Sequence, residues 1–164
     1  MKKLVFTTNT GHTVEYVKIL SDETEMSAFS LEAAVKDLPK QTEVIYCGWL
    51  FANNIKGYKK AAKRFNIKAV CAVGLCDTGT AVEQVRKANK IPENIPIFTM
   101  QGGIDKGKLR GINRFMINML IKALNSKKQP TDDEKRMIEL LNSDENYVCK
   151  ENTSEFMKWY KKNK

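Results

Sequence analysis

Short apolar runs alternate with amphipathic stretches along the first three quarters of the chain. Five runs are compact and mostly apolar, as expected for strands buried on both faces of a parallel sheet: Leu4–Thr8, Met26–Ser30, Val44–Cys47, Ala69–Val73 and Ile97–Met100. The stretches between and after them are typical of helices: Thr13–Leu20, Leu31–Leu38, Ile55–Phe65, Thr80–Lys90 and Lys108–Leu124. This alternation predicts an α/β fold, a doubly wound sheet of five parallel strands with too few units to close a barrel.

The pattern changes after Leu124. Residues 126–130 are typical of a linker, and Thr131 with Glu134 forms a capping-box signature that begins a helix ending near Leu141. A polar loop then precedes a last amphipathic helix, Asn152–Lys161. We therefore predict a domain over residues 1–124 and a C-terminal helical appendage over residues 125–164, packed on the same domain.

The loop after the first strand is rich in hydroxyl groups, and its glycine lies just before a helical pattern. The candidate binding residues are Thr8, Asn9, Thr10, Gly11, His12 and Thr13. Free N–H groups at a helix start, the helix dipole and threonine hydroxyls together favour an anion such as a phosphate monoester. The alternative is an ordinary turn in which Asn9 or Thr10 caps the helix.

Two further loops follow the third and fourth strands. Their candidate residues are Gly48, Trp49, Leu50 and Phe51 in one loop, and Gly74, Leu75, Cys76 and Asp77 in the other. The aromatic residues can stack on a flat ring, and the glycines allow the backbone to approach a ligand. Loops after parallel strands meet at one sheet edge. The alternatives are aromatic side chains that join the core, a capped glycine turn, and a Cys76 that only fills its loop.

Composition and charge narrow the partners. Apolar residues make up 42% of the 164-residue chain and charged residues 29%, which is ordinary for a globular protein. The four cysteines form no CxxC pair, and the chain has one histidine, so we predict no metal site. The net charge of +9 favours anionic partners, but no motif indicates specific nucleic-acid binding. The N-terminus has no signal-peptide pattern, which predicts a cytoplasmic protein.

The predicted helix Lys108–Leu124 has a wide apolar stripe interspersed with basic residues. We interpret this stripe as the face by which the last helix packs on the sheet, because amphipathic helices usually bury it. The alternative is a basic amphipathic helix that makes peripheral contact with an anionic membrane surface.

The segment from Thr8 to Thr13 resembles the flavin-phosphate loop of the flavodoxins, Ser/Thr-x-Thr-Gly-x-Thr, and it likewise follows the first strand. The resemblance covers roughly residues 1–124. It extends to the branch that includes the protoporphyrinogen dehydrogenases, through Gln101–Asp105 and Asn113–Lys122. The family implies a strand order 2-1-3-4-5 with FMN bound at the switch point.

The resemblance also assigns roles to individual residues. It implies that Thr8, Thr10, His12 and Thr13 bind the phosphate, that Trp49 stacks on the flavin ring and that Gly74–Asp77 follows its edge. The expected function is electron transfer or oxidoreduction with FMN, alongside a redox partner protein or a small-molecule substrate. Two alternatives stay open: a binding or regulatory module without flavin, and a membrane-surface dehydrogenase that acts on a porphyrinogen or a quinone. The sequence assigns no catalytic residue.

Overall fold

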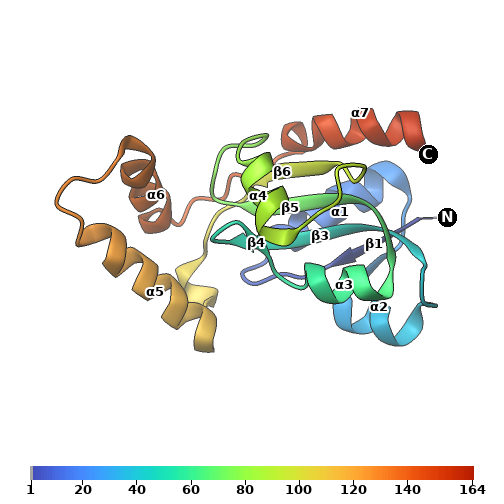
Figure 1. Cartoon of the computed structure of the whole chain (residues 1–164), viewed down its shortest axis with the longest axis horizontal. Coiled ribbons are helices and arrows are strands. Elements are labelled where there is room, and N and C mark those ends of the chain that lie inside the picture. Colours follow the sequence, from blue (N-terminus) through green and yellow to red (C-terminus); the bar gives the residue numbers. More distant parts are fainter. Residues whose placement is uncertain (1) are drawn as a thin grey trace.

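The computed structural model describes residues 2–164 and shows a three-layer α/β arrangement (Figure 1). The strands are β1 (Lys3–Phe6), β2 (Ala28–Ser30), β3 (Glu43–Phe51), β4 (Asn54–Ile55), β5 (Asn66–Gly74) and β6 (Ile97–Gln101). The α-helices are α1 (His12–Thr24), α2 (Leu31–Asp37), α3 (Tyr58–Arg64), α4 (Val82–Asn89), α5 (Gly111–Asn125), α6 (Asp132–Asn142) and α7 (Ser154–Asn163). Short 3-10 turns, η1 (Lys106–Lys108) and η2 (Lys150–Thr153), precede α5 and α7. The prediction of an α/β fold is confirmed.

The sheet runs in the order β2-β1-β3-β5-β6, and all the pairs along this path are parallel. The two-residue strand β4 lies off the path and pairs antiparallel with the end of β3. The sheet therefore has six strands, not the five expected. The extra strand arises where the sequence predicted the loop after β3 and the start of a helix at Ile55, because the chain turns back on itself instead.

Side chains alternate between the two faces of the sheet, as the period of a strand requires. On β1, Leu4 faces α1 and α7, whereas Val5 faces α2, α3 and α4. The same alternation continues along β3 and β5, where the side chains from Val44 to Cys47 and from Ala69 to Val73 are almost fully buried. The helices therefore cover both faces, which explains why the strands are nearly continuous apolar runs.

The helix that completes the layer beside α1 is α7. Its Phe156 is fully buried and meets Phe98 of β6 edge to face, with ring centroids 5.5 Å apart. Trp159 lies 5.9 Å from the same Phe98 ring. The prediction that the helix ending at Leu124 packs on the sheet is wrong, because α7 occupies that layer.

Helices α5 and α6 instead form a pair that projects from one end of the sheet (Figure 1). We call this pair, residues 111–142, the helical hairpin. A small apolar cluster joins it to the body, with Leu109, Ile117 and Leu141 buried at its centre. The chain then returns to the body, where the Tyr147 N–H donates to the Gly102 carbonyl at 2.8 Å. None of the helices within residues 2–164 is long and apolar enough to cross a membrane.

Candidate functional site

A cavity of about 370 Å³ lies between the carboxyl ends of the central strands and the helical hairpin. Its volume is in the range of small-molecule sites, roughly 300–1,000 Å³. The loops after β1 and β5, the end of β3 and the segment after β6 line one side of it. Side chains of α5 and α6 line the other side. The position matches the general rule that open α/β sheets bind ligands beyond the carboxyl ends of their strands.

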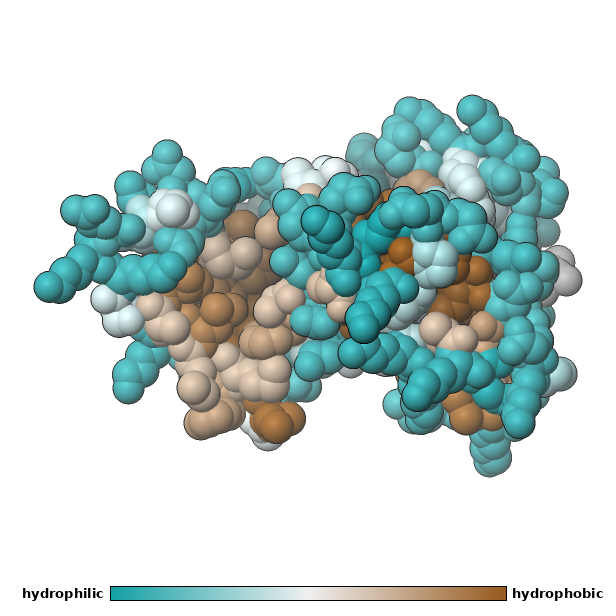
Figure 2. Space-filling view, viewed as in Figure 1, coloured by the Kyte–Doolittle hydropathy of each residue, from teal (hydrophilic) through white to brown (hydrophobic). Residues whose placement is uncertain are grey.

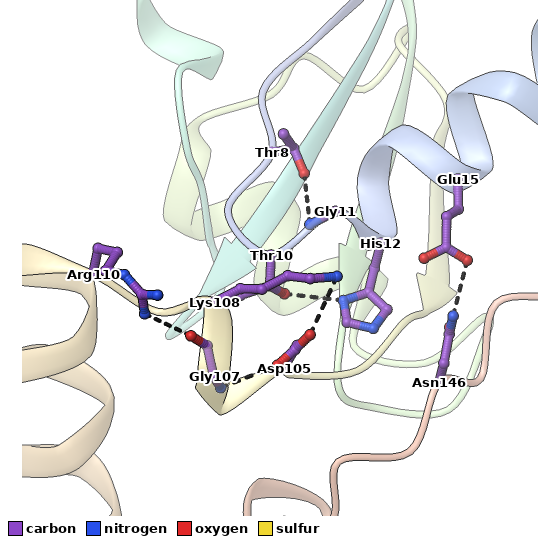
Figure 3. A network of polar contacts seen from close by, with 10 residues as sticks. All are labelled: Thr8, Thr10, Gly11, His12, Glu15, Asp105, Gly107, Lys108, Arg110 and Asn146. Atoms are coloured by element: carbon purple, nitrogen blue, oxygen red, sulfur yellow. Dashed lines mark hydrogen bonds and ion pairs between the residues drawn. The ribbon is translucent and has the colours of Figure 1, made fainter.

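The first loop lines the cavity with hydroxyl groups. The Thr8 hydroxyl accepts a hydrogen bond from the Gly11 N–H at 3.2 Å, and the Thr10 hydroxyl lies 3.0 Å from His12 Nδ1 (Figure 3). Gly11 has a left-handed backbone, with φ of 105°, and leads directly into α1. The sequence predicted a turn here, and glycine adopts the left-handed backbone of this turn without steric cost.

The N-terminus of α1 is left without a side-chain cap. The helix begins at His12, and no side chain of the described residues bonds to its first N–H groups. The interpretation of Asn9 or Thr10 as an N-cap is therefore wrong, since Thr10 bonds to the His12 ring instead. The amides at a helix start have no intrahelical acceptor and carry partial positive charge. The loop thus offers backbone and hydroxyl donors at the cavity.

His12 is largely buried beside this loop and lines the cavity. Burial lowers the pKa of the imidazole below its ordinary value of 6.5, and the positive charge of Lys108 lowers it further. Glu15 and Asp105 oppose the shift. Figure 3 shows Lys108 reaching from η1 toward the His12 ring while it pairs with Asp105, at 3.2 Å. The cavity therefore contains a neutral imidazole at pH 7, next to a cation.

The aromatic residues after β3 lie on a β-hairpin, not in an open loop. Residues Ala52 and Asn53 both have positive φ, 46° and 63°, which is the geometry of a type I′ turn. Trp49, Leu50 and Phe51 precede this turn and line the cavity. The Lys56 ammonium group lies over the Trp49 and Phe51 rings, 5.5 and 5.6 Å from their centroids. The hairpin thus presents two aromatic rings with a cation beside them.

Asn89 of α4 holds this hairpin in place. Its side-chain carbonyl accepts from the Ile55 N–H at 2.8 Å, and its amide donates to the Asn53 carbonyl at 2.8 Å. A third bond joins the amide to Val85 within the helix. Asn89 is almost fully buried. A buried amide with its hydrogen bonds satisfied fixes one hairpin conformation, since any other leaves it unpaired.

The loop after β5 brings Gly74, Leu75 and Cys76 to the cavity. Burial raises the pKa of the Cys76 thiol, and the charge of Asp77 raises it further. The thiol is therefore protonated at neutral pH, which disfavours a role for Cys76 as a nucleophile. Asp77 turns away and pairs with Arg136 of α6, at 2.9 Å, so it ties the loop to the helical hairpin.

Three of the residues predicted to bind a ligand do not line the cavity: Gly11, Gly48 and Asp77. Gly48 has a packing role, because a Cβ there would lie 2.5 Å from Ile55 Cγ2. The structure brings the other predicted residues together around one cavity: Thr8, Asn9, Thr10, His12, Thr13, Trp49, Leu50, Phe51, Gly74, Leu75 and Cys76.

The sequence did not predict the wall contributed by the helical hairpin. This wall is mostly apolar, with two carboxylates, and consists of Ile117, Leu120, Leu124, Asp133, Glu134, Met137 and Leu141. Lys127 hydrogen-bonds to Glu134 and lowers the pKa of the Glu134 carboxyl, which is therefore ionised at neutral pH. The apolar spacing on both helices was visible in the sequence, but it did not show what the helices face.

Within the described part of the chain, no group of three or more histidine, cysteine, aspartate or glutamate side chains is arranged so that it could hold a metal ion. The arrangement is a cavity with hydrogen-bond donors at one end, aromatic rings at the side and an apolar wall opposite. Comparisons with models of protein families, with curated proteins and with solved structures found no match to this chain.

Proposed function

We propose that the protein binds FMN in this cavity and carries out electron transfer or oxidoreduction with it, as a flavodoxin-like protein. The observation that supports this most is convergence. The hydroxyl-rich loop, the aromatic hairpin and the loop after β5, which were selected from separate parts of the sequence, line a single cavity at the switch edge of the sheet.

The donor set at the first loop fits a phosphate monoester. Thr8, Thr10 and Thr13 provide hydroxyl groups, and the uncapped start of α1 provides backbone N–H groups. The loop from Thr8 to Thr13 contains no acidic residue that would repel an anion. Charge-assisted hydrogen bonds of this kind are about twice as strong as neutral ones. The phosphate of FMN would lie there.

The rest of the cavity fits a flat ring system. Trp49 and Phe51 provide aromatic faces, and Leu120, Leu124 and Met137 provide an apolar surface opposite. Such surfaces favour planar heteroaromatic ligands and exclude water from them.

FMN, when bound, supplies the electron chemistry, and the protein supplies binding, orientation and electrostatics. Here the first loop anchors the phosphate, and the β-hairpin that Asn89 holds in place positions the aromatic rings. The helical hairpin shields the cavity from solvent, and the Lys56 cation beside the rings favours negative charge nearby.

The absorbance spectrum of the purified full-length protein tests the proposal. Bound oxidised flavin absorbs near 450 nm (a general property of the cofactor), so a yellow protein, or a 1:1 complex after FMN is added, is expected. If a titration with FMN gives no saturable complex, flavin binding is excluded. A flavin-free binding module is then the better explanation.

Threonine variants test the orientation of the ligand. We expect T10A/T13A to weaken FMN binding roughly 10- to 100-fold, because hydrogen bonds to a charged group are lost, and to leave riboflavin, which lacks the phosphate, nearly unaffected. The matched control is T24A, which removes a buried hydroxyl at the other end of α1, where it bonds to Leu20. Equal losses for FMN and riboflavin would refute the phosphate assignment.

A further inference from the structure

The outer face of α5 exposes three large apolar side chains. Ile112, Phe115 and Met119 are 72%, 62% and 56% exposed. Among residues 2–164 these three are the exposed large hydrophobic side chains. Their spacing of three and four residues places them on one side of the helix. Figure 2 shows apolar surface gathered over the helical hairpin, at the end of the molecule away from the termini.

This exposed row is distinct from the face that lines the cavity. Ile117, Leu120 and Leu124 point toward α6 and the cavity, and Ile117 is 4% exposed. The packing of the helical hairpin therefore buries one apolar face of α5 and leaves the other face uncovered. Burying such an outer row is favourable in proportion to the apolar area removed from water.

The segment that carries the row is basic, although two of its lysines are paired with carboxylates, Lys108 with Asp105 and Lys127 with Glu134. The segment from residue 106 to residue 128 contains seven basic residues and no acidic one: Lys106, Lys108, Arg110, Arg114, Lys122, Lys127 and Lys128. Arg114 and Lys122 lie on α5 itself, are exposed, and make no ion pair with any described residue. Their long aliphatic stems can follow an apolar surface while their charges stay in water.

This charge pattern decides between the surfaces that could cover the row. A two-fold contact between copies of the chain is self-complementary, so it would place the same cations opposite one another. An anionic lipid surface instead offers apolar depth for the row and negative charge for its flanks. A helix with this pattern, too short to span a bilayer, lies in the plane of the interface.

We propose that α5 docks the protein on anionic lipid bilayers, with Ile112, Phe115 and Met119 inserted at the level of the headgroups and Arg114 and Lys122 beside the lipid phosphates. The cavity lies on the opposite side of α5 and stays outside the bilayer. This proposal does not depend on FMN binding.

Vesicle flotation of the full chain tests the proposal. The protein is expected to float with vesicles of phosphatidylcholine and phosphatidylglycerol at 3:1 and not with phosphatidylcholine alone. The variant I112S/F115S/M119S is expected to bind the anionic vesicles at least about tenfold more weakly, because the apolar contribution is lost. These side chains are exposed, so the variant folds, and circular dichroism checks that it does.

A matched pair of charge variants separates a docking helix from general electrostatics. R114Q/K122Q is expected to weaken binding about 30-fold, from about 1 kcal/mol for each cation near the surface. K59Q/K63Q removes the same charge from exposed positions on α3 and is expected to change binding less than threefold. Equal losses for the two pairs, or equal binding to neutral vesicles, would overturn the proposal.

The oligomeric state of the free protein provides the remaining test. Light scattering is expected to give the mass of a monomer for both the parent protein and I112S/F115S/M119S. A dimer that the triple variant dissociates would assign the row to an interface between copies and overturn the lipid assignment. If the triple variant loses flotation but keeps its flavin, the loss of lipid binding is independent of the proposed cofactor.

Discussion

The sheet body and the helical hairpin use apolar residues in opposite ways. Phe156 in the body is fully buried between α7 and the sheet, whereas Phe115 in the hairpin is 62% exposed. Both residues lie on amphipathic helices with neighbouring basic residues. The comparison shows that an amphipathic pattern specifies an apolar face and leaves open what that face contacts.

The largest difference is expected between F156A and F115A. We expect F156A to lower the free energy of unfolding by about 3–5 kcal/mol, because it leaves a cavity among three aromatic rings. F115A is expected to change it by less than about 0.5 kcal/mol, as for other exposed positions. Urea denaturation followed by circular dichroism measures both. Similar effects of the two substitutions would mean that Phe115 is buried in solution.

Alanine at two glycines gives the next largest contrast. Gly103 has φ of 155°, and a Cβ there would clash with the Glu145 carbonyl and lie 3.1 Å from His12 Nε2. We expect G103A to cost about 2–3 kcal/mol, because a backbone carbonyl cannot move aside cheaply. Gly111 begins α5 with φ of 54° in open space, so G111A is expected to cost only about 1 kcal/mol of left-handed strain.

The same denaturation curves would contradict this contrast if G111A destabilised the protein as much as G103A. That result would indicate a tight packing of the hairpin against the body at Gly111.

Two helix caps test whether the hairpin unfolds independently of the body. Thr131 and Glu134 form a capping box on α6, and Ser30 caps α2 by accepting from the Ala33 N–H at 3.2 Å. Each alanine substitution removes about 1 kcal/mol. We expect T131A to speed hydrogen exchange in α5 and α6 alone, and S30A to lower protection throughout the body. Uniform loss of protection in T131A would show that the two regions unfold together.

The smallest expected effect is a pH dependence at the cavity. Because the pKa of His12 is lowered by burial, the unfolded chain binds more protons than the folded protein below pH 6.5. His12 therefore contributes stability that is fully present above pH 6.5 and is lost as the pH falls through its lower folded value. H12Q is expected to flatten this part of the stability curve, measured by urea denaturation between pH 7 and pH 4.5. An unchanged slope would assign the effect to other groups.

The sequence predicted the positions of the five parallel strands and of the loops that line the cavity. Strand burial made this possible, since runs such as Val44–Cys47 and Ala69–Val73 have no polar face and must lie inside a covered sheet. The turn after β1 was predictable because Gly11 meets its backbone requirement; that the threonines beside it bind a phosphate stays a prediction. The role of Gly48 was not predictable, since it depends on contact with Ile55 across a hairpin that the pattern did not reveal.

The sequence by itself determined the five parallel strands and the helices that alternate with them, because hydrophobic period is a local property. Only the tertiary structure decided that α7, and not α5, covers the sheet, and that α5 and α6 form a wall of the cavity. Helices α5 and α7 offer apolar faces of a similar kind. Which of them covers the sheet therefore depends on how well Phe156 and Trp159 fit against Phe98. Such complementarity exists only between surfaces already brought together, and no local pattern encodes it.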